Sequence, residues 1–240
     1  DPTAMGSHLF FNGKEQYSNM GHELWKSNGT EAGTVMVKDI NPNGSSNPNG
    51  LTDLNGTLFF SADDDVHGRE LWKSDGTGPG TVMVKDICPG ASNSAYVYPA
   101  VSNHRLFFAG NDGVSGKELW KSDGTEAGTV EVKDINPAGG SNPEHLTDVN
   151  GTLFFMANGV NLRRWELWKS DGTEAGTVMV KRFDPGGYIA MPDDFFNFNG
   201  VLYFMADDDV HGRELWKSDG TEAGTVMVQD INPGKSHSYP

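Results

Sequence analysis

The chain has a single cysteine, Cys88, in 240 residues. One thiol cannot form a disulfide within the chain, and it cannot supply the several thiolates of a cysteine metal cluster. Asparagine holds the corresponding position in three similar segments, at Asn41, Asn136 and Asn232. Cys88 is therefore expected to be a packed small residue without a chemical role.

Positive charge and long apolar runs are also scarce. Lysine and arginine number 18 against 33 acidic residues, which gives a formal net charge of -15. A field of this sign repels a phosphate backbone, so the composition argues against nucleic acid as a partner. The chain contains no run of about 18 apolar residues, and the sequence therefore predicts no membrane insertion.

What the chain has in abundance is repetition. The tripeptide Glu-Leu-Trp occurs five times, at intervals of 47, 48, 48 and 48 residues, beginning at Glu23, Glu70, Glu118, Glu166 and Glu214. Self-similarity at this interval, with β-type patterning inside each repeat, is typical of propeller blades. The period predicts a single domain over residues 9–240. Its five blades are expected at about 9–48, 49–96, 97–144, 145–192 and 193–240.

Turn signals divide each repeat into four strands. In the second repeat, Asn55-Gly56 is the pair that most readily takes the positive φ angles of a tight hairpin. Asp75-Gly76 opens the last turn of the same repeat. The predicted strands are residues 51–54, 57–62, 70–73 and 81–87. The expected fold is all-β, a five-bladed β-propeller with four antiparallel strands per blade.

Each repeat carries a tryptophan in its third strand, next to a leucine that faces the other side. Identical placement in all five repeats favours packing between blades over binding of a sugar ring. These residues are Trp25, Trp72, Trp120, Trp168 and Trp216. Trp165 has no counterpart in the other repeats, so it is the tryptophan for which ligand contact is expected.

Strand directions place the loops before Glu-Leu-Trp and the links between blades at one end of each blade. The sequence varies most there, whereas the Asp-Gly-Thr turns at the other end repeat almost unchanged. Such variation reflects either relaxed drift or a binding surface rich in aromatic and basic side chains. The candidate ligand-binding residues are Tyr96, Tyr98, His67, Arg163, Arg164, Trp165, Tyr188 and His211.

Two runs of acidic residues in these loops are candidates for a calcium site, because Ca²⁺ takes six to eight oxygen ligands. Known calcium loops space their carboxylates alternately, whereas three successive carboxylates point in different directions. Solvated turn acids are therefore the alternative interpretation. The residues are Asp63, Asp64, Asp65, Asp207, Asp208 and Asp209. We expect no other cofactor.

The sequence offers little for catalysis. It contains no evident Ser, His and Asp arrangement, glycine-rich phosphate loop or paired-carboxylate motif. No histidine recurs in all five repeats, and the predicted inner strands contribute mainly Thr52, Asp53 and Asp148. We predict that the protein is not an enzyme, with a propeller hydrolase as the remaining catalytic alternative.

The block Glu-Leu-Trp-Lys-Ser-Asp-Gly-Thr that begins at Glu118 resembles the ELWxxDGT repeat family of bacterial proteins. The same pattern begins at Glu70, Glu166 and Glu214, and the first copy differs by Asn28 in place of aspartate. The resemblance covers nearly the whole chain. It implies a secreted or surface-attached bacterial protein whose repeats form propellers, and it implies no particular ligand.

Two functions follow as hypotheses from the repeats and the resemblance. The leading hypothesis is a non-catalytic binding or adhesion module whose target is a glycan or a protein. The alternative is a structural repeat array, or an excised or engineered propeller with no ligand of its own.

The first repeat lacks a predicted inner strand. Residues 1–8 resemble a cloning scar, and Leu9 aligns with Leu58 in the second strand of the next repeat. An open strand edge invites aggregation, so either residues 1–8 or the C-terminal tail is expected to pair with it. The protein is then a monomer if the ring closes, and an oligomer of partial rings if it does not.

Overall fold

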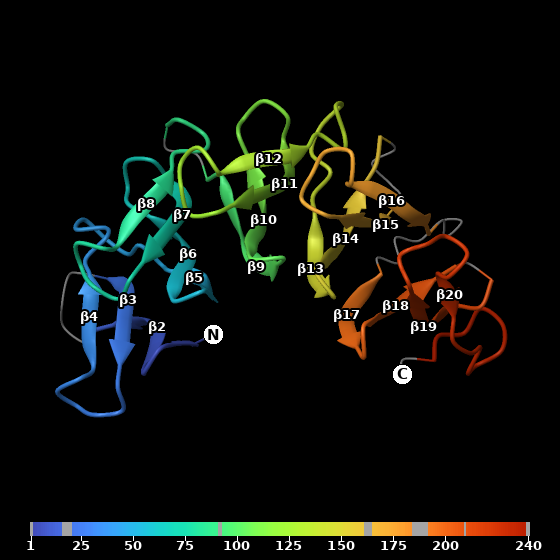
Figure 1. Cartoon of the computed structure of the whole chain (residues 1–240), viewed down its shortest axis with the longest axis horizontal. Helices are drawn as coiled ribbons and strands as arrows, with labels where there is room; N and C mark the ends of the chain where they lie inside the picture. The colour runs from blue at the N-terminus through green and yellow to red at the C-terminus, as the bar shows by residue number, and fades with distance from the viewer. Residues whose placement is uncertain are drawn as a thin grey trace. The chain divides into compact units, whose positions relative to one another are not determined.

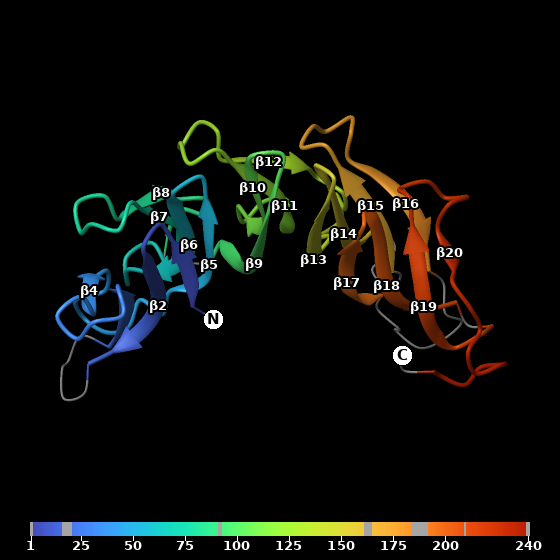
Figure 2. The ribbon, with the colours of Figure 1, turned by 60° about the horizontal axis from the view of Figure 1, so that its bottom comes forward.

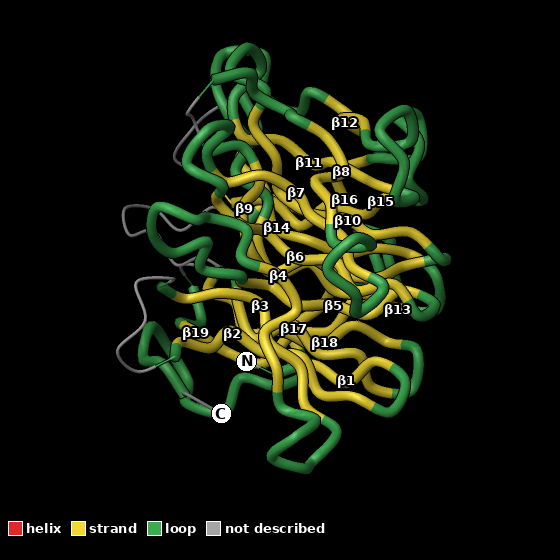
Figure 3. Tube along the Cα trace, turned by 90° about the vertical axis from the view of Figure 1, so that its left-hand side faces the viewer, coloured by secondary structure: helices red, strands yellow, loops and turns green. Residues whose placement is uncertain are grey.

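The computed structural model describes residues 2–15, 21–90, 93–160, 165–183, 192–208 and 210–238. These residues form strands, turns and loops, and they contain no helix (Figure 3). Within the same ranges, no helix is therefore long and apolar enough to cross a membrane.

The strands form five antiparallel sheets of four strands, each built from one continuous stretch of chain with neighbouring strands adjacent (Figure 1). The first sheet contains β1 (Thr3–Met5), β2 (His8–Lys14), β3 (His22–Ser27) and β4 (Val35–Lys38). The second contains β5 (Asn49–Leu54), β6 (Thr57–Asp63), β7 (Arg69–Ser74) and β8 (Val82–Lys85). The third contains β9 (Ala95–Ser102), β10 (Arg105–Asn111), β11 (Lys117–Ser122) and β12 (Val130–Lys133). The fourth contains β13 (Glu144–Val149), β14 (Thr152–Asn158), β15 (Trp165–Ser170) and β16 (Val178–Arg182). The fifth contains β17 (Asp193–Phe198), β18 (Val201–Asp207), β19 (Arg213–Ser218) and β20 (Val226–Met227).

The predicted all-β architecture of five four-stranded antiparallel repeats is confirmed. Residues from the segment that resembles a cloning scar supply strand β1, which pairs antiparallel with β2 through Thr3 opposite Phe10 and Met5 opposite His8. Figure 2 shows the strands of each sheet side by side from a second direction.

The chain forms two compact units. One contains residues 1–116 and 120–130, and the other contains residues 117–119 and 131–240. The first and second sheets belong to the first unit, and the fourth and fifth belong to the second.

Asparagine and glycine form the hairpins between the first and second strands of the second, fourth and fifth sheets, as their positive φ angles require. Asn55 and Gly56 have φ angles of 54° and 82°. The amide of Gly56 also donates a hydrogen bond to Asp53 Oδ1 over 3.0 Å. The same pair of conformations recurs at Asn150-Gly151 and Asn199-Gly200, so these turns fix the register of the strands beside them.

The Asp-Gly-Thr turns are held by their own side chains. Asp75 Oδ1 accepts hydrogen bonds from the amide and the hydroxyl of Thr77, over 2.8 and 2.7 Å. The amide of Gly80 in turn donates to Thr77 Oγ1, and a Cβ at Gly80 would lie 2.1 Å from Asp75 Oδ1. Aspartate, threonine and the second glycine are therefore all required locally, which explains why this turn repeats almost unchanged.

Apolar side chains from successive sheets pack face to face. In the second sheet, Phe60 lies opposite Trp72 across β6 and β7, and both pack on Phe10 and Leu24 of the first sheet. We call the face of a sheet that carries the tryptophan its knob face. The opposite face, which receives the tryptophan of the following sheet, is the socket.

The same packing recurs in both units. Trp120 of the third sheet packs into the socket of the second, among Phe59, Leu71 and Ile87. In the second unit, Trp216 of the fifth sheet packs against the socket residues of the fourth. Exposed fractions of 5% for Trp120 and 6% for Trp216 show that these indoles are almost completely buried.

Two lysines on the socket of the first sheet reach the second sheet. Lys26 Nζ donates to the carbonyl of Gly76 over 2.8 Å. Lys38 Nζ donates to the carbonyl of Thr81 over 2.8 Å and lies 5.8 Å from the ring centroid of Trp72. The ammonium groups thus satisfy carbonyls of the next sheet, and one of them also lies over its tryptophan.

Equivalent lysine contacts recur along the chain. They are Lys73 to Gly124, Lys85 to Thr129, Lys133 to Thr177 and Lys169 to Gly220. Lys85, Lys133 and Lys181 lie 5.7, 6.0 and 5.7 Å from the centroids of Trp120, Trp168 and Trp216.

Leu9 and Leu58 occupy the same position on the knob faces of the first and second sheets, and they provide a matched test of this packing. Leu58 is 0% exposed and Leu9 is 43% exposed. Leu58→Ala should lower the free energy of unfolding by about 2–5 kcal/mol. Leu9→Ala should lower it by less than about 1 kcal/mol. Urea denaturation of dilute protein measures both values, and equal losses would contradict the assignment of the faces.

Candidate functional site

The loops before the third strands and the links between sheets lie at the same end of each sheet. Backbone hydrogen bonds join each link to the start of a third strand, as from Ser94 N to Arg69 O over 3.0 Å. The link then meets the following sheet, since Asn111 N donates to Ser94 O over 2.9 Å. We call this region, with its loops and links, the loop end.

The glutamate of Glu-Leu-Trp holds the link in place. Glu23 is 0% exposed and its carboxylate accepts hydrogen bonds from Ile40 N, Ser46 N and Ser46 Oγ, over 2.9, 2.9 and 2.6 Å. Glu118 accepts from Ile135 N over 3.1 Å and from the amide and hydroxyl of Ser141. This role was missed at the level of sequence, although the recurrence of the glutamate in all five repeats was its signal.

Burial makes these glutamates weak acids. Removal from water raises the pKa of Glu70 to about 7, and it raises the pKa of Glu118 to about 7. Hydrogen bonds from the links oppose this increase without cancelling it. Burial likewise raises the pKa of Glu23 above its usual value.

The glutamate of the fourth sheet has different hydrogen-bond partners. Glu166 Oε1 accepts from Arg182 Nε over 2.8 Å, and Arg182 Nη2 lies 2.6 Å from the same oxygen. Trp168 Nε1 donates to Glu166 Oε2 over 3.1 Å. The positive charge of Arg182 therefore compensates the negative charge of the Glu166 carboxylate.

Aspartates of the candidate calcium loops form hydrogen bonds with their own loops. Asp64 Oδ1 accepts from the amides of Val66 and His67, over 3.0 and 2.8 Å. Its Oδ2 lies 2.7 Å from His67 Nδ1. Burial alone would raise the pKa of Asp64, but the hydrogen bonds from His67 and Val66 outweigh it and lower the pKa. The bond to Asp64 raises the pKa of His67.

The second acidic loop repeats this arrangement. Asp208 Oδ1 accepts from the amides of Val210 and His211, over 3.0 and 2.9 Å, and Asp208 Oδ2 lies 2.8 Å from His211 Nδ1. Asp207 Oδ2 lies 3.8 Å from His237 Nδ1.

Of the remaining candidate metal ligands, Asp63 ends strand β6 and Asp65 lies in the loop that follows. Asp63 Oδ1 accepts the amide of Asp65 over 2.8 Å, and Asp209 lies outside the described residues. Across the described ranges, no three His, Cys, Asp or Glu side chains are grouped as metal ligands.

Three of the eight candidate ligand-binding residues have described side chains. Trp165 is half-buried at the start of β15 and packs against the core between the fourth and fifth sheets. His67 and His211 are partly exposed, each beside its aspartate. Tyr96 and Tyr98 lie in β9, but their side chains are outside the description, and Arg163, Arg164 and Tyr188 are outside it altogether.

A set of exposed valines at the loop end was not predicted from the sequence. Val66, Val114 and Val210 are 66%, 90% and 60% exposed. An aspartate two residues earlier accepts the amide of each valine, as Asp112 does for Val114 over 2.8 Å. Their signal in the sequence was the Asp-x-Val pattern that three loops share. The repeat period by itself identifies these residues only as part of a turn.

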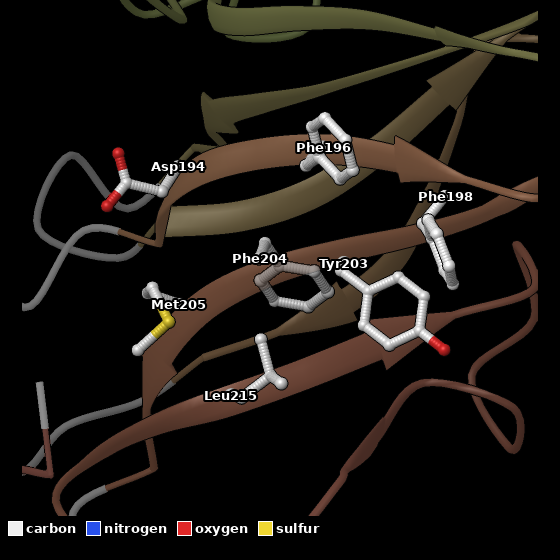
Figure 4. Close-up of a pocket in the computed structure, with 7 residues that line it drawn as sticks. All are labelled: Asp194, Phe196, Phe198, Tyr203, Phe204, Met205 and Leu215. Carbon is white, nitrogen blue, oxygen red and sulfur yellow. The ribbon is translucent and has the colours of Figure 1, made fainter. Parts of the chain in front are cut away.

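A second missed feature is an apolar hollow of ≈ 390 Å³ on the fifth sheet. Figure 4 shows Phe196 and Phe198 on β17 beside Tyr203 on β18 and Leu215 on β19. Phe196 and Phe198 are 62% and 55% exposed. Its signal was the aromatic run at 195–198, where the second repeat has Leu-Thr-Asp-Leu.

Solved structures resemble the chain in fold. A structure of puromycin hydrolase shares 12% identity over 95% of this chain and 38% of its own, with a TM-score of 0.52. A puromycin-hydrolyzing peptidase of Mycobacterium tuberculosis shares 10% identity over 95% of this chain and 37% of its own, with a TM-score of 0.54. A structure from an analysis of two prolyl endopeptidases shares 10% identity over 92% of this chain and 32% of its own, with a TM-score of 0.53.

The chain thus spans about a third of the length of these peptidases. At such low identity the likeness concerns the fold alone. No protein-family model matches the chain, and no curated protein sequence matches it.

The buried glutamates predict that stability falls as the pH rises. A carboxyl with a pKa near 7 in the folded state and near 4.5 when unfolded binds more protons when folded. Its contribution is complete below about pH 4.5 and is lost as the pH passes about 7. Urea denaturation between pH 4.5 and 8 should therefore give a falling free energy of unfolding across that window.

Glutamine substitutions at two positions separate the charge from the hydrogen bonds. Among the described residues Glu70 Oε1 has no hydrogen-bond partner, so the amide nitrogen of Glu70→Gln can occupy its place. Both oxygens of Glu118 accept hydrogen bonds, so Glu118→Gln places an N–H against a donor and should cost about 1–3 kcal/mol more. Glu70→Gln should also flatten the pH dependence. An unchanged slope, or equal losses in both variants, would contradict this description.

Asp64 should hold the protonated form of His67. Because the hydrogen bond to Asp64 raises the pKa of His67, Asp64→Asn should lower that pKa. The matched change Asp65→Asn leaves the contact intact. NMR titration of the His67 ring measures both variants, and the same His67 pKa in wild type and Asp64→Asn would refute the pairing.

Proposed function

We propose that the five sheets are the blades of a β-propeller, and that the protein is a non-catalytic binding or adhesion module. The stacking of four-stranded sheets through buried tryptophans and the fold likeness to the solved structures support the architecture. The resemblance to ELWxxDGT repeats supports a secreted or surface location in a bacterium.

The exposed valines of the loop end carry the proposal. Each projects from a loop whose backbone is already ordered by an aspartate cap. A preordered loop loses little conformational entropy when it binds. The loop end therefore presents apolar contacts at low entropic cost, next to His67 and His211, whose pKa values are raised by hydrogen bonds to Asp64 and Asp208.

A protein fits these contacts better than a glycan. A branched apolar side chain packs against the apolar side chains of a protein, but it offers a sugar no hydrogen bond. The net charge of -15 further favours a target with a basic surface, since complementary charge accelerates encounter. A glycan target and a purely structural role are the alternative outcomes.

A binding screen against arrays of proteins and glycans tests the proposal, with and without Ca²⁺. The loop variant carries Val66→Ser, Val114→Ser and Val210→Ser. The matched control carries Val35→Ser, Val82→Ser and Val178→Ser, in fourth strands where the valines are 41%, 37% and 38% exposed. We expect protein targets whose Kd rises at least about tenfold for the loop variant and is unchanged for the control.

Other outcomes contradict the proposal in different ways. If only glycans bind, the target is a sugar and not a protein. If the loop variant binds the targets as tightly as the wild type does, the binding site does not lie at the loop end. A screen without any target would favour the structural array.

A further inference from the structure

The socket of the fifth sheet is exposed where the equivalent sockets are buried. Phe198 and Ile231 are 55% and 53% exposed, whereas Leu54 and Ile87 hold the same positions on the second sheet and are 8% and 5% exposed. Val228 is 46% exposed against 7% for Val84. Trp120 of the following sheet packs among the second-sheet residues.

The hollow in Figure 4 is this socket. Tyr203 and Leu215 hold the positions of Phe59 and Leu71, which contact Trp120. The hollow therefore lies where the other sockets receive an indole.

The knob face of the first sheet is exposed in the complementary way. Leu9 is 43% exposed, and its equivalents on the other four sheets are each 0% exposed. These are Leu58, Leu106, Leu153 and Leu202. Trp25 is only half-buried, and Gly29 and Thr34 are exposed. At the equivalent positions, Gly76 and Thr81 are buried and their carbonyls accept lysines.

We propose that the socket of the fifth sheet binds the knob face of the first sheet of a second copy of this chain. Both surfaces are halves of an interface that the chain already forms between its successive sheets. Because the two faces differ, the contact is head to tail, and each copy keeps one free face for a further copy or for closure. Burial of the exposed aromatic patch provides the driving force.

The contacts of the proposed interface follow from the interfaces within the chain. Trp25 enters the hollow against Phe198 and Leu215, as Trp120 enters the socket of the second sheet. Lys217 is exposed, and it donates to the carbonyl of Gly29 as Lys26 donates to that of Gly76.

The fifth socket departs from the others at two positions. Gln229 stands where Lys38 lies over Trp72 in the first sheet, so the new interface lacks one lysine contact with the tryptophan. Phe196 replaces the smaller Thr52 and enlarges the apolar surface. The association therefore depends more on apolar burial than the internal interfaces do.

Sedimentation velocity of the full chain measures the association directly. The mass should rise in steps of 26.0 kDa as the concentration is raised from about 1 μM to about 200 μM. Added salt should strengthen the association, because it screens repulsion between acidic copies. A mass of one chain at every concentration and salt would overturn the proposal, since the exposed faces then bind no second copy.

Two complementary variants test the orientation. Phe198→Asp disables the socket and Trp25→Ala disables the knob face, so each alone should remain a single chain. An equimolar mixture should regain one interface and form complexes of two chains. The control Val160→Asp changes a 67% exposed valine that belongs to neither face and should associate as the wild type does. Failure of the mixture to associate, or association of either variant alone, would overturn the assignment.

Two further variants keep the test independent of folding. If Trp25→Ala disturbs the first sheet, as near-ultraviolet circular dichroism would show, Leu9→Asp disables the same face at a position that is already partly exposed. Gln229→Lys restores the lysine contact and should lower the Kd about threefold or more. An unchanged or higher Kd would show that Trp25 does not occupy the hollow.

Discussion

The structure depends on the burial of a sheet's tryptophan in the socket of the sheet before it, as occurs at Trp72, Trp120 and Trp216. A sheet of four short strands has two apolar faces and cannot bury either face by itself. Stacking buries both faces, and the lysines that cross the interface satisfy carbonyls of the next sheet. The constancy of the Leu, Phe and Trp positions follows from this geometry, because each residue fills a site that its neighbour repeats.

The buried glutamate provides the second constraint. In the first three sheets it accepts hydrogen bonds from amides in the link that leads to the next sheet, so it fixes where the new sheet begins. Burial raises the pKa of these three glutamates and makes the attachment sensitive to pH. The Asp-Gly-Thr turn at the other end of the sheet is satisfied by its own side chains. Both ends are thus ordered locally, and the loops before the third strands remain free to present different side chains.

The strands could be predicted well from sequence, because turn residues and alternation are local signals. The third strand was expected at residues 70–73 and occurs at Arg69–Ser74. The recurrence of the glutamate marks Glu70 as important, but the sequence does not show its role, because its partner Ile87 lies 17 residues away. Likewise, sequence periodicity places Phe198 in a strand but does not show that its face is exposed. That exposure depends on which surface packs against the fifth sheet.

Side-chain NMR of the lysines tests the stacking of tryptophan and lysine most directly. The ε-methylene protons of Lys38, Lys85, Lys133 and Lys181 lie near indole rings, so ring currents should shift them upfield of those of Lys217. Trp72→Leu should return the signal of Lys38 alone to the position of Lys217. Identical shifts for all these lysines, or no response of Lys38 to Trp72→Leu, would contradict the account.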